Sequence, residues 1–149
     1  MSRAIQLAID NVRDGGGPFG AVIVRDAKIV AEGANQVTAS IDPTAHAEVL
    51  AIRAACAKLE VFDLCGCEIY SSCEPCPMCL GAIYWARLSR IYFAGSAGDA
   101  AQSGFDDSVI YAEIAKPYSL RTIPAIQMMR EEALAGFRAW EEKPNKISY

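Results

Sequence analysis

The chain has 149 residues, of which 52% are hydrophobic and 21% are charged, a composition typical of a globular protein with a sizeable core. The formal net charge is −4 and no run of lysine and arginine occurs, so the sequence lacks the electrostatic footprint of a nucleic-acid-binding protein. It also lacks the long apolar segment of a signal peptide or a membrane span. We therefore expect one cytoplasmic domain over residues 1–149.

The hydrophobic pattern alternates between helical and strand spacing, which predicts an α/β fold. In chain order, we expect a helix over 2–13, strands over 19–24 and 28–32, a helix over 43–59, a strand over 68–71, a helix over 76–86, a strand over 90–94, irregular helix over 97–115, a strand over 121–127, a helix over 129–141 and an extended tail over 142–149. The first two strands should form a hairpin around Asp26 and Ala27. Asp42 is the expected N-cap of the second helix, because Pro43 follows it.

Six cysteines and a single histidine, His46, restrict the chemistry that the chain can perform. Disulfides seldom persist in the cytoplasm, so metal binding or catalysis is the better explanation for so many cysteines. Cys76 and Cys79 lie three apart on an expected first helical turn, where they share one face and where the helix N-terminus stabilises thiolate charge. His46 with Cys76 and Cys79 therefore predicts a zinc site with three protein ligands and a fourth position for water.

Glu48 is expected to move protons at this site, because it lies two residues from His46 and no ligand set requires it. Zinc lowers the pKa of a bound water to about 7, which makes hydroxide available at neutral pH. Helical residues two apart point in different directions, so His46 and Glu48 would have to reach around the ion. The alternative is a closed and inert site with Cys73 as a fourth ligand, although Cys73 should precede the helix and point elsewhere.

Zinc nucleobase deaminases carry an H-x-E motif and a P-C-x-x-C motif, and on both motifs the chain resembles the cytidine deaminase superfamily. Within it, the chain resembles the bacterial guanine deaminases through segments spread over nearly its whole length: GGPFGAVIV, DPTAHAEVLAIRAAC, SSCEPCPMCLGAIYWAR, GFDDSVIYAEI, RTIP and the closing NK-x-x-Y. The segment FDDSxIYxEI discriminates best, because tRNA adenosine deaminases and cytosine deaminases share the zinc motifs but not this segment. The resemblance implies a three-layer α/β fold, with a mixed sheet of about five strands and helices on both faces. It also implies Zn²⁺ as the cofactor and hydrolytic deamination of guanine to xanthine and ammonia by a zinc-bound hydroxide.

Four residues are candidates for binding the base. The resemblance implies that Asn35 hydrogen-bonds the purine ring. Phe19 and Trp85 are candidates because an aromatic ring can stack on a base, and the backbone N–H of Ala47 is a candidate because of its position near the expected helix start. The alternatives are a turn residue for Asn35 and ordinary core residues for Phe19 and Trp85.

Asp106 and Asp107 are the candidates for substrate selection. Guanine presents N1–H and the C2 amino group as adjacent donors, and an ionised carboxylate is an acceptor only, so the two are complementary. The resemblance places an aspartate of this motif in the site, with Asp107 the first candidate and Asp106 the second. Asp107 would orient the base and share in proton transfer. The alternative is a solvated turn, or an N-cap for a helix that begins at Ser108.

Tyr149 ends a tail, residues 142–149, that resembles a lid closing the pocket and exchanged between the subunits of a homodimer. The alternative is a frayed terminus. The expected partner is a small purine base, with no nucleic acid, no membrane and no redox or nucleotide cofactor. Three other functions stay open: a guanosine deaminase, a tRNA adenosine deaminase with a basic RNA-binding surface, and a non-catalytic zinc-stabilised binding domain.

Overall fold

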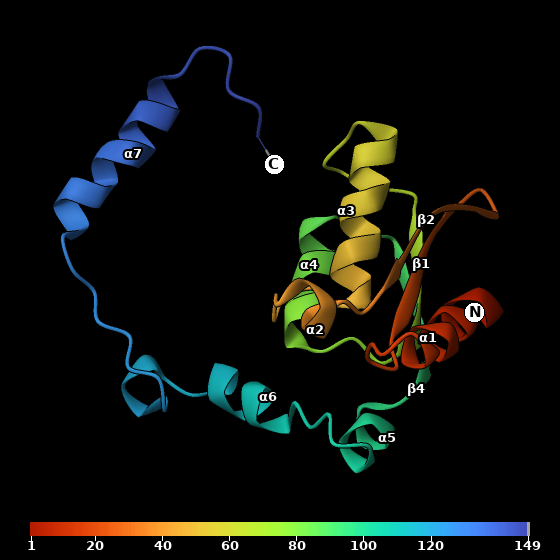
Figure 1. Cartoon of the computed structure of the whole chain (residues 1–149). Coiled ribbons are helices and arrows are strands. Elements are labelled where there is room, and N and C mark those ends of the chain that lie inside the picture. The colour runs from red at the N-terminus through yellow and green to blue at the C-terminus, as the bar shows by residue number, and fades with distance from the viewer. Residues whose placement is uncertain (149) are drawn as a thin grey trace. The chain divides into compact units, whose positions relative to one another are not determined.

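The computed structural model describes residues 1–148 and divides the chain into two compact units at the bond between Ser108 and Val109. The first unit contains α1 (Ser2–Arg13), β1 (Gly20–Arg25), β2 (Lys28–Ala34), α2 (Val37–Ser40), α3 (Ala47–Leu59), β3 (Glu68–Cys73), α4 (Pro77–Trp85), β4 (Arg90–Gly95) and α5 (Ala97–Gln102) (Figure 1). The second unit contains α6 (Ser108–Ala115), apart from its first residue, a 3-10 turn (Tyr118–Leu120) and α7 (Arg130–Glu142). Whether the two units act as the single domain expected from the sequence stays a prediction.

The sheet of the first unit has the strand order β2-β1-β3-β4 and is mixed. Strand β1 runs antiparallel to β2 and β3, and β3 runs parallel to β4. The predicted hairpin is confirmed, because Asp26 and Ala27 both have positive φ angles, 50° and 59°, as the favoured two-residue hairpin turn requires. The parallel pair is joined through α4, since parallel strands need a crossover connection. This crossover brings the start of α4 to the end of β3, where the candidate site lies.

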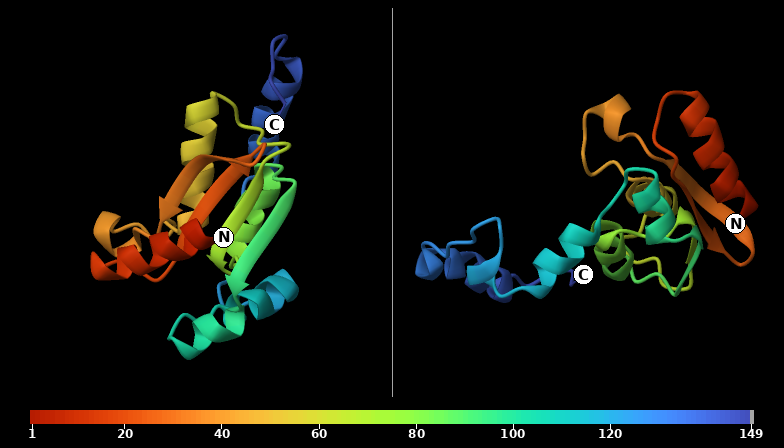
Figure 2. Two further views of the ribbon diagram at one scale, coloured as in Figure 1. Left: turned by 90° about the vertical axis from the view of Figure 1, so that its right-hand side faces the viewer. Right: turned by 90° about the horizontal axis from the view of Figure 1, so that it is seen from below.

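Helices cover both faces of the sheet, and Figure 2 shows α1 on the face opposite α3 and α4. Contact with α1 is close at Gly20, where a Cβ atom would lie 2.4 Å from the carbonyl oxygen of Ala4. On the other face, a Cβ atom on Gly33 would lie 2.2 Å from the carbonyl oxygen of Ala47. Glycine at these two positions lets the helix backbones rest on the strands, so the predicted three-layer architecture is confirmed.

The main hydrophobic core lies between the sheet and α3. Its buried members come from β1, β2, α3, β3, α4 and the loops that join them: Ala21, Ile23, Ala31, Ala47, Ala51, Ile52, Ala55, Leu64, Cys67, Ile69, Ile83 and Ala86. Small side chains predominate on α3, which allows the helix to approach β2 closely. The N-terminus of α3 is therefore held in a fixed position relative to the sheet.

The prediction of a strand over residues 121–127 is wrong. The described residues form a sheet of four strands, rather than the expected five or so. The Arg121 guanidinium donates hydrogen bonds to the carbonyl oxygens of Ile114 and Lys116, and the Thr122 N–H donates to the Glu113 carboxylate. Pro124 lacks an N–H and interrupts any ladder. These local bonds replace the pairing that a strand would need.

The expected helix start at Asp42 is also wrong, because α3 begins at Ala47 with His46 at its N-cap. The Asp42 carboxylate instead accepts hydrogen bonds from the N–H and the hydroxyl of Thr44, at 2.8 and 2.7 Å. An aspartate side chain that binds the backbone two residues later forms its own local turn, which competes with helix capping. His46 therefore has extended backbone geometry, with φ −72° and ψ 151°.

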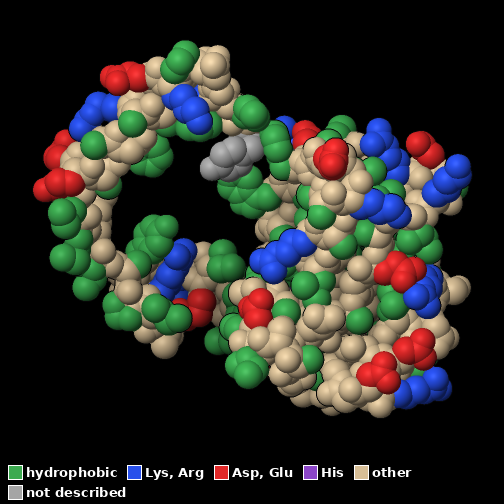
Figure 3. All heavy atoms as spheres, turned by 45° about the horizontal axis from the view of Figure 1, so that its top comes forward, with side chains coloured by type: hydrophobic (Ala, Val, Ile, Leu, Met, Phe, Trp, Pro, Cys, Tyr) green, Lys and Arg blue, Asp and Glu red, His purple; other side chains and the backbone are tan. Residues whose placement is uncertain are grey.

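The second unit is helical, and none of its described residues, 109–148, is buried. Large hydrophobic side chains are exposed along it, at Val109, Ile110, Tyr111, Ile114, Tyr118, Leu120, Ile123, Ile126, Met128, Met129, Phe137, Trp140 and Ile147. Figure 3 shows green hydrophobic side chains gathered along this unit. Over residues 1–148, no helix has the length and apolar character needed to cross a membrane.

Candidate metal centre and base pocket

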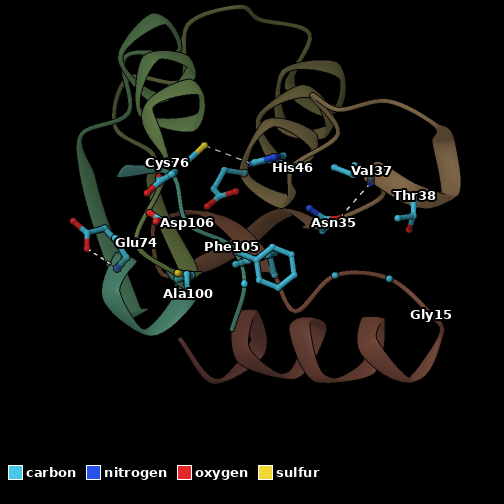
Figure 4. A pocket seen from close by; sticks show the side chains of 18 residues that line it. Gly15, Asn35, Val37, Thr38, His46, Glu74, Cys76, Ala100, Phe105 and Asp106 are labelled. Carbon is cyan, nitrogen blue, oxygen red and sulfur yellow. Dashed lines mark hydrogen bonds between the residues drawn. The ribbon is translucent and has the colours of Figure 1, made fainter. Parts of the chain in front are cut away.

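Three potential metal ligands meet at the N-termini of α3 and α4. The ligand atoms of His46, Cys76 and Cys79 all lie within 4.8 Å of one another. His46 Nδ1 lies 3.5 Å from the Sγ atom of each cysteine, and Figure 4 shows Cys76 and His46 directed toward each other. His46 and Cys76 occupy the two N-caps, and Cys79 lies at the third position of α4. Both helix N-termini therefore point their positive ends toward the cluster.

The spacing of these atoms fits zinc. Zinc bonds of about 2.0 Å to nitrogen and about 2.3 Å to sulfur separate a nitrogen and a sulfur ligand by about 3.5 Å in tetrahedral geometry. The observed separations of 3.5 Å between His46 Nδ1 and the two sulfur atoms agree with that value. Two thiolates and an imidazole are also the donor set that favours zinc over harder ions.

Without a metal ion, the three ligands differ in how readily they lose a proton, and only Cys76 is stabilised as an anion. The pKa of the Cys76 thiol is lowered to about 4, first because the Cys79 thiol donates a hydrogen bond to it and then because His46 lies beside it. The same bond, together with burial, raises the pKa of Cys79, and the hydrogen bond to Cys76 raises the pKa of His46. Negative charge is thus stabilised on Cys76 at neutral pH.

Cys73 does not join the cluster in the part of the chain that the structure describes. It ends β3 and its Sγ donates to the carbonyl oxygen of Ser96 at 3.6 Å. The closed site with four protein ligands, considered from the sequence, therefore has no support in the geometry.

Glu48 lies at the second position of α3 and is 4% exposed. Its Oε1 accepts a hydrogen bond from the Ser71 hydroxyl at 2.9 Å, and its Oε2 lies 3.3 Å from Cys79 Sγ. The two-residue spacing from His46 creates no conflict, because His46 is in the extended N-cap position rather than in the helix. Both side chains line the same cavity.

This cavity has a volume of about 510 Å³ and opens beside the metal ligands. Its lining comes from the loop after α1, the start of α2, the N-termini of α3 and α4, and the segment from α5 to Asp107: Gly15, Gly16, Gly17, Phe19, Asn35, Val37, Thr38, His46, Glu48, Cys73, Glu74, Cys76, Ala97, Ala100, Gly104, Phe105, Asp106 and Asp107. The glycine loop and Phe105 are parts of the lining that were not expected from the sequence. Glycines contribute backbone rather than side-chain chemistry, so their only signal was the triplet before β1.

Asn35 and Phe19, both candidates from the sequence, line this cavity, and Figure 4 shows where Asn35 lies. Asn35 is buried, its Oδ1 accepts from the N–H of Val37 at 3.2 Å, and its carbonyl oxygen accepts from Asn11 Nδ2 at 2.8 Å. Phe19 packs edge-to-face on Phe105, with ring centroids 4.9 Å apart. The two rings form an apolar wall against which a flat base can pack.

The two aspartates of the FDDS segment have different environments. The Asp106 carboxylate accepts a hydrogen bond from the Ser108 N–H at 2.9 Å. Its pKa is lowered first by a hydrogen bond from the Ser108 side chain and then by this backbone hydrogen bond. Asp107 is half-buried, and burial, followed by the nearby charge of Cys76, raises its pKa. Both residues line the cavity, and Asp106 is held by its hydrogen bonds with Ser108.

The remaining sequence-based candidates lie elsewhere or outside the described residues. Trp85 is the last residue of α4, is 72% exposed and is not part of the cavity lining. Nine residues of helix carry it about 13 Å along the axis from Cys76, which explains the difference. Ala47 is the first residue of α3, with its side chain fully buried. Tyr149 lies outside the described residues.

The metal ligand His46 and both cysteines of the cluster lie in a segment that matches a known family. Residues 1–95 match the model of the cytidine and deoxycytidylate deaminase zinc-binding region. The chain belongs to this family. Its cofactor is zinc, and the deaminase fold places His46, Cys76 and Cys79 to bind it.

Three relatives of this deaminase chain differ in how much of it they match. Guanine deaminase of Bacillus subtilis is 57% identical over 100% of this chain and 96% of the relative, and its X-ray structure gives a TM-score of 0.96 over 99% of this chain and 95% of that one. The structure of guanine deaminase from Nitrosomonas europaea is 29% identical, with a TM-score of 0.68 over 93% of this chain and 80% of that one. A tRNA-specific adenosine deaminase of Agrobacterium fabrum is 39% identical over 67% of this chain and 70% of the relative.

Proposed function

We propose that this chain hydrolyses guanine to xanthine and ammonia. The observation that carries the proposal is the extent of the match to the Bacillus subtilis guanine deaminase, which covers 100% of this chain. That extent includes the FDDS segment and the tail, whereas the match to the tRNA-specific adenosine deaminase covers 67%. The substrate is thus inferred from a match that extends over the whole chain, including the part that the adenosine deaminase match leaves uncovered.

Residues of this chain have separable roles in the proposed reaction. Zinc bound by His46, Cys76 and Cys79 would supply a Lewis acid that makes water a better nucleophile at neutral pH. Glu48 accepts the proton of the attacking water and delivers protons to the ring nitrogen and to the leaving amine. The water oxygen forms a bond to C2, the C2–amine bond breaks, and ammonia leaves, so that guanine and one water become xanthine and ammonia.

Other groups of the cavity hold the base. The half-buried Asp107 accepts hydrogen bonds from N1–H and the amino group of guanine. Asn35 binds the ring edge and Phe19 its face, with the Ala47 N–H as a further donor at the start of α3. Asp106 also lines the cavity and is the alternative to Asp107 as the acceptor.

We also propose that the chain forms a homodimer in the cytoplasm. The support for a dimer is the second unit, because exposed hydrophobic side chains are numerous there and none of the described residues 109–148 is buried. The support for the cytoplasm is that all six cysteines are free. The tail over 142–149 would act as the lid, exchanged between subunits. Sedimentation analysis of the purified protein tests the dimer, and a single monomeric species would contradict it.

The test of the substrate is direct. Purified, zinc-loaded protein is incubated separately with guanine, guanosine, adenosine, cytosine and tRNA, and ammonia release is measured. We expect turnover of guanine. Turnover of another of these substrates, with none of guanine, would contradict the proposal and identify the alternative function.

A further inference from the structure

Ser71 is a polar side chain in an otherwise apolar strand face. On β3, burial alternates, and the inward positions are Ile69, Ser71 and Cys73. Ser71 is 1% exposed. A hydroxyl buried this deeply is unfavourable unless it is hydrogen-bonded, and an apolar side chain would pack there at no such cost. The hydroxyl therefore needs an explanation from its partner.

That partner is the carboxylate of Glu48. The Ser71 hydroxyl donates to Glu48 Oε1 at 2.9 Å, while Glu48 Oε2 lies 3.3 Å from Cys79 Sγ. The two carboxylate oxygens are thus held in different directions. The terminal torsion of a glutamate has a broad energy profile, so the donors on its oxygens decide how the group is turned, and Ser71 is the donor to Oε1.

The donor is attached to a rigid part of the fold. Ser71 pairs with Ala21 of β1 on one side and with Phe93 of β4 on the other, so its backbone lies in the interior of the sheet. Ser71 does not line the cavity, whereas Glu48 does. Any effect of Ser71 on the reaction must therefore pass through Glu48.

We propose that Ser71 is a positioning residue, whose hydroxyl holds the Glu48 carboxylate in the orientation that proton transfer requires. The inference rests on the proposed function, because it assigns Ser71 a part in the same deamination. Ser71 forms no bond to substrate and exchanges no proton with it. It fixes which oxygen of Glu48 faces the cavity.

Replacing Ser71 with alanine tests this role, with Ser72→Ala as a matched control. Ser72 is the next residue of β3, and its hydroxyl accepts a hydrogen bond from the N–H of Gly20 at 3.0 Å, away from the candidate active-site cavity. Each variant removes one hydroxyl bond from the same strand. For guanine, we expect Ser71→Ala to lower kcat by about 10- to 100-fold, a part of the roughly 100- to 10,000-fold that general acid–base catalysis contributes. KM should stay within about twofold, because the lost interaction matters only in the transition state.

Two further readouts separate positioning from a purely structural role. The zinc content and melting temperature of Ser71→Ala should match those of Ser72→Ala, whose kcat should equal that of the wild type. The solvent deuterium isotope effect on kcat should increase in Ser71→Ala only, because proton transfer becomes more limiting. A kcat within twofold of the wild type, or a loss of kcat matched by a loss of zinc, would overturn the proposal.

A second pair of variants keeps the test decisive if alanine disturbs folding. Ser71→Thr and Ser71→Val have side chains of the same shape, and only threonine retains the donor. We expect the threonine variant to exceed the valine variant in kcat by at least about tenfold, and equal values would count against Ser71. Absence of guanine turnover by the wild type would refute the proposed function instead. The same ratios, measured on the substrate that is turned over, would then test Ser71 separately.

Discussion

Three acidic side chains, those of Glu48, Cys76 and Asp107, line the same cavity. Carboxylates and a thiolate that share a cavity repel one another unless positive charge offsets them. The N-termini of α3 and α4 supply part of this positive charge, and a bound zinc ion would supply the rest. The requirement for a cation is therefore set by the side chains themselves.

Replacing Glu48 with glutamine should abolish most of the activity. The substitution keeps the size of the side chain and its ability to accept from Ser71, but removes the proton acceptor. We expect kcat to fall by about 100- to 10,000-fold while the zinc content is unchanged. Steady-state kinetics and metal analysis of the same sample check this. Activity near the wild-type value would remove Glu48 from the mechanism.

The two aspartates should respond differently to conversion into asparagine. Asp107→Asn removes a charged acceptor from the proposed guanine edge, so kcat/KM for guanine should fall by about 10- to 100-fold, as loss of a hydrogen bond to a charged group predicts. Asp106→Asn should have a smaller effect, because the asparagine side-chain oxygen can still accept the hydrogen bond from the Ser108 N–H. Kinetics of both variants check the ranking, and the reverse order would assign the substrate to Asp106.

The metal ligands could be predicted from the sequence because ligation depends on side-chain type and short spacing. Ser71 and Asn11 could not, since their contribution depends on partners 23 and 24 residues away. Trp85 is a candidate because an aromatic ring can stack on a base, and only the length of α4 shows that it lies far from the cluster. The chemical type of each residue could thus be read from the sequence, but the distance of its side chain from the metal cluster could not.

At the scale of elements, the site depends on where two helices begin. The expected N-terminus at Asp42 placed His46 inside a helix, where it could not share a direction with Glu48. The observed N-cap at His46 removes that conflict. Hydrophobic spacing predicted that α3 exists, but its first residue depended on whether Asp42 caps the helix or forms its own turn. These two local structures, a helix cap and a side-chain turn, have similar energies, so tertiary packing determines which of them forms.

The close contact between β2 and α3 makes a prediction for stability. A Cβ atom on Gly33 would lie 2.2 Å from the Ala47 carbonyl oxygen, so Gly33→Ala must displace the start of α3. We expect a loss of about 1–3 kcal/mol in the free energy of unfolding, as overpacking typically causes, and weaker zinc binding. Urea denaturation and metal titration measure both quantities.

Gly81→Ala is the control for that substitution. A Cβ atom at Gly81 would meet no atom within 4 Å, and the residue lies in the exposed part of α4. Alanine in a helix is favoured over glycine by about 0.5–1 kcal/mol, so this variant should be slightly more stable than the wild type. A Gly33→Ala protein as stable as Gly81→Ala would show that α3 can shift freely.

On the scale of the whole molecule, the metal links two helices that approach the site from different parts of the chain. Removal of zinc by a chelator should abolish activity and lower the melting temperature, because a ligand that binds only the folded state stabilises it. Activity assays and calorimetry before and after re-addition of zinc check the effect. An unchanged melting temperature would show that the cluster contributes nothing to folding.

The tail provides a second prediction at this scale. Truncation before Lys143 should reduce guanine turnover by at least about tenfold while the melting temperature changes little, because lid closure excludes water and retains the base. Kinetics and thermal unfolding of the truncated protein measure this, with Ile147→Ser as a milder control in the same exposed segment. Full activity without the tail would remove the lid from the proposed mechanism.

His46 and Cys76 both occupy N-cap positions, so each joins a loop to the first turn of a helix. A chain without its metal has two adjacent helix starts that open more readily, and such openings are where proteases cleave. Unmetallated copies should consequently be degraded faster than loaded ones. Zinc supply in the cell would then set how many molecules of this protein persist, in addition to how many are active.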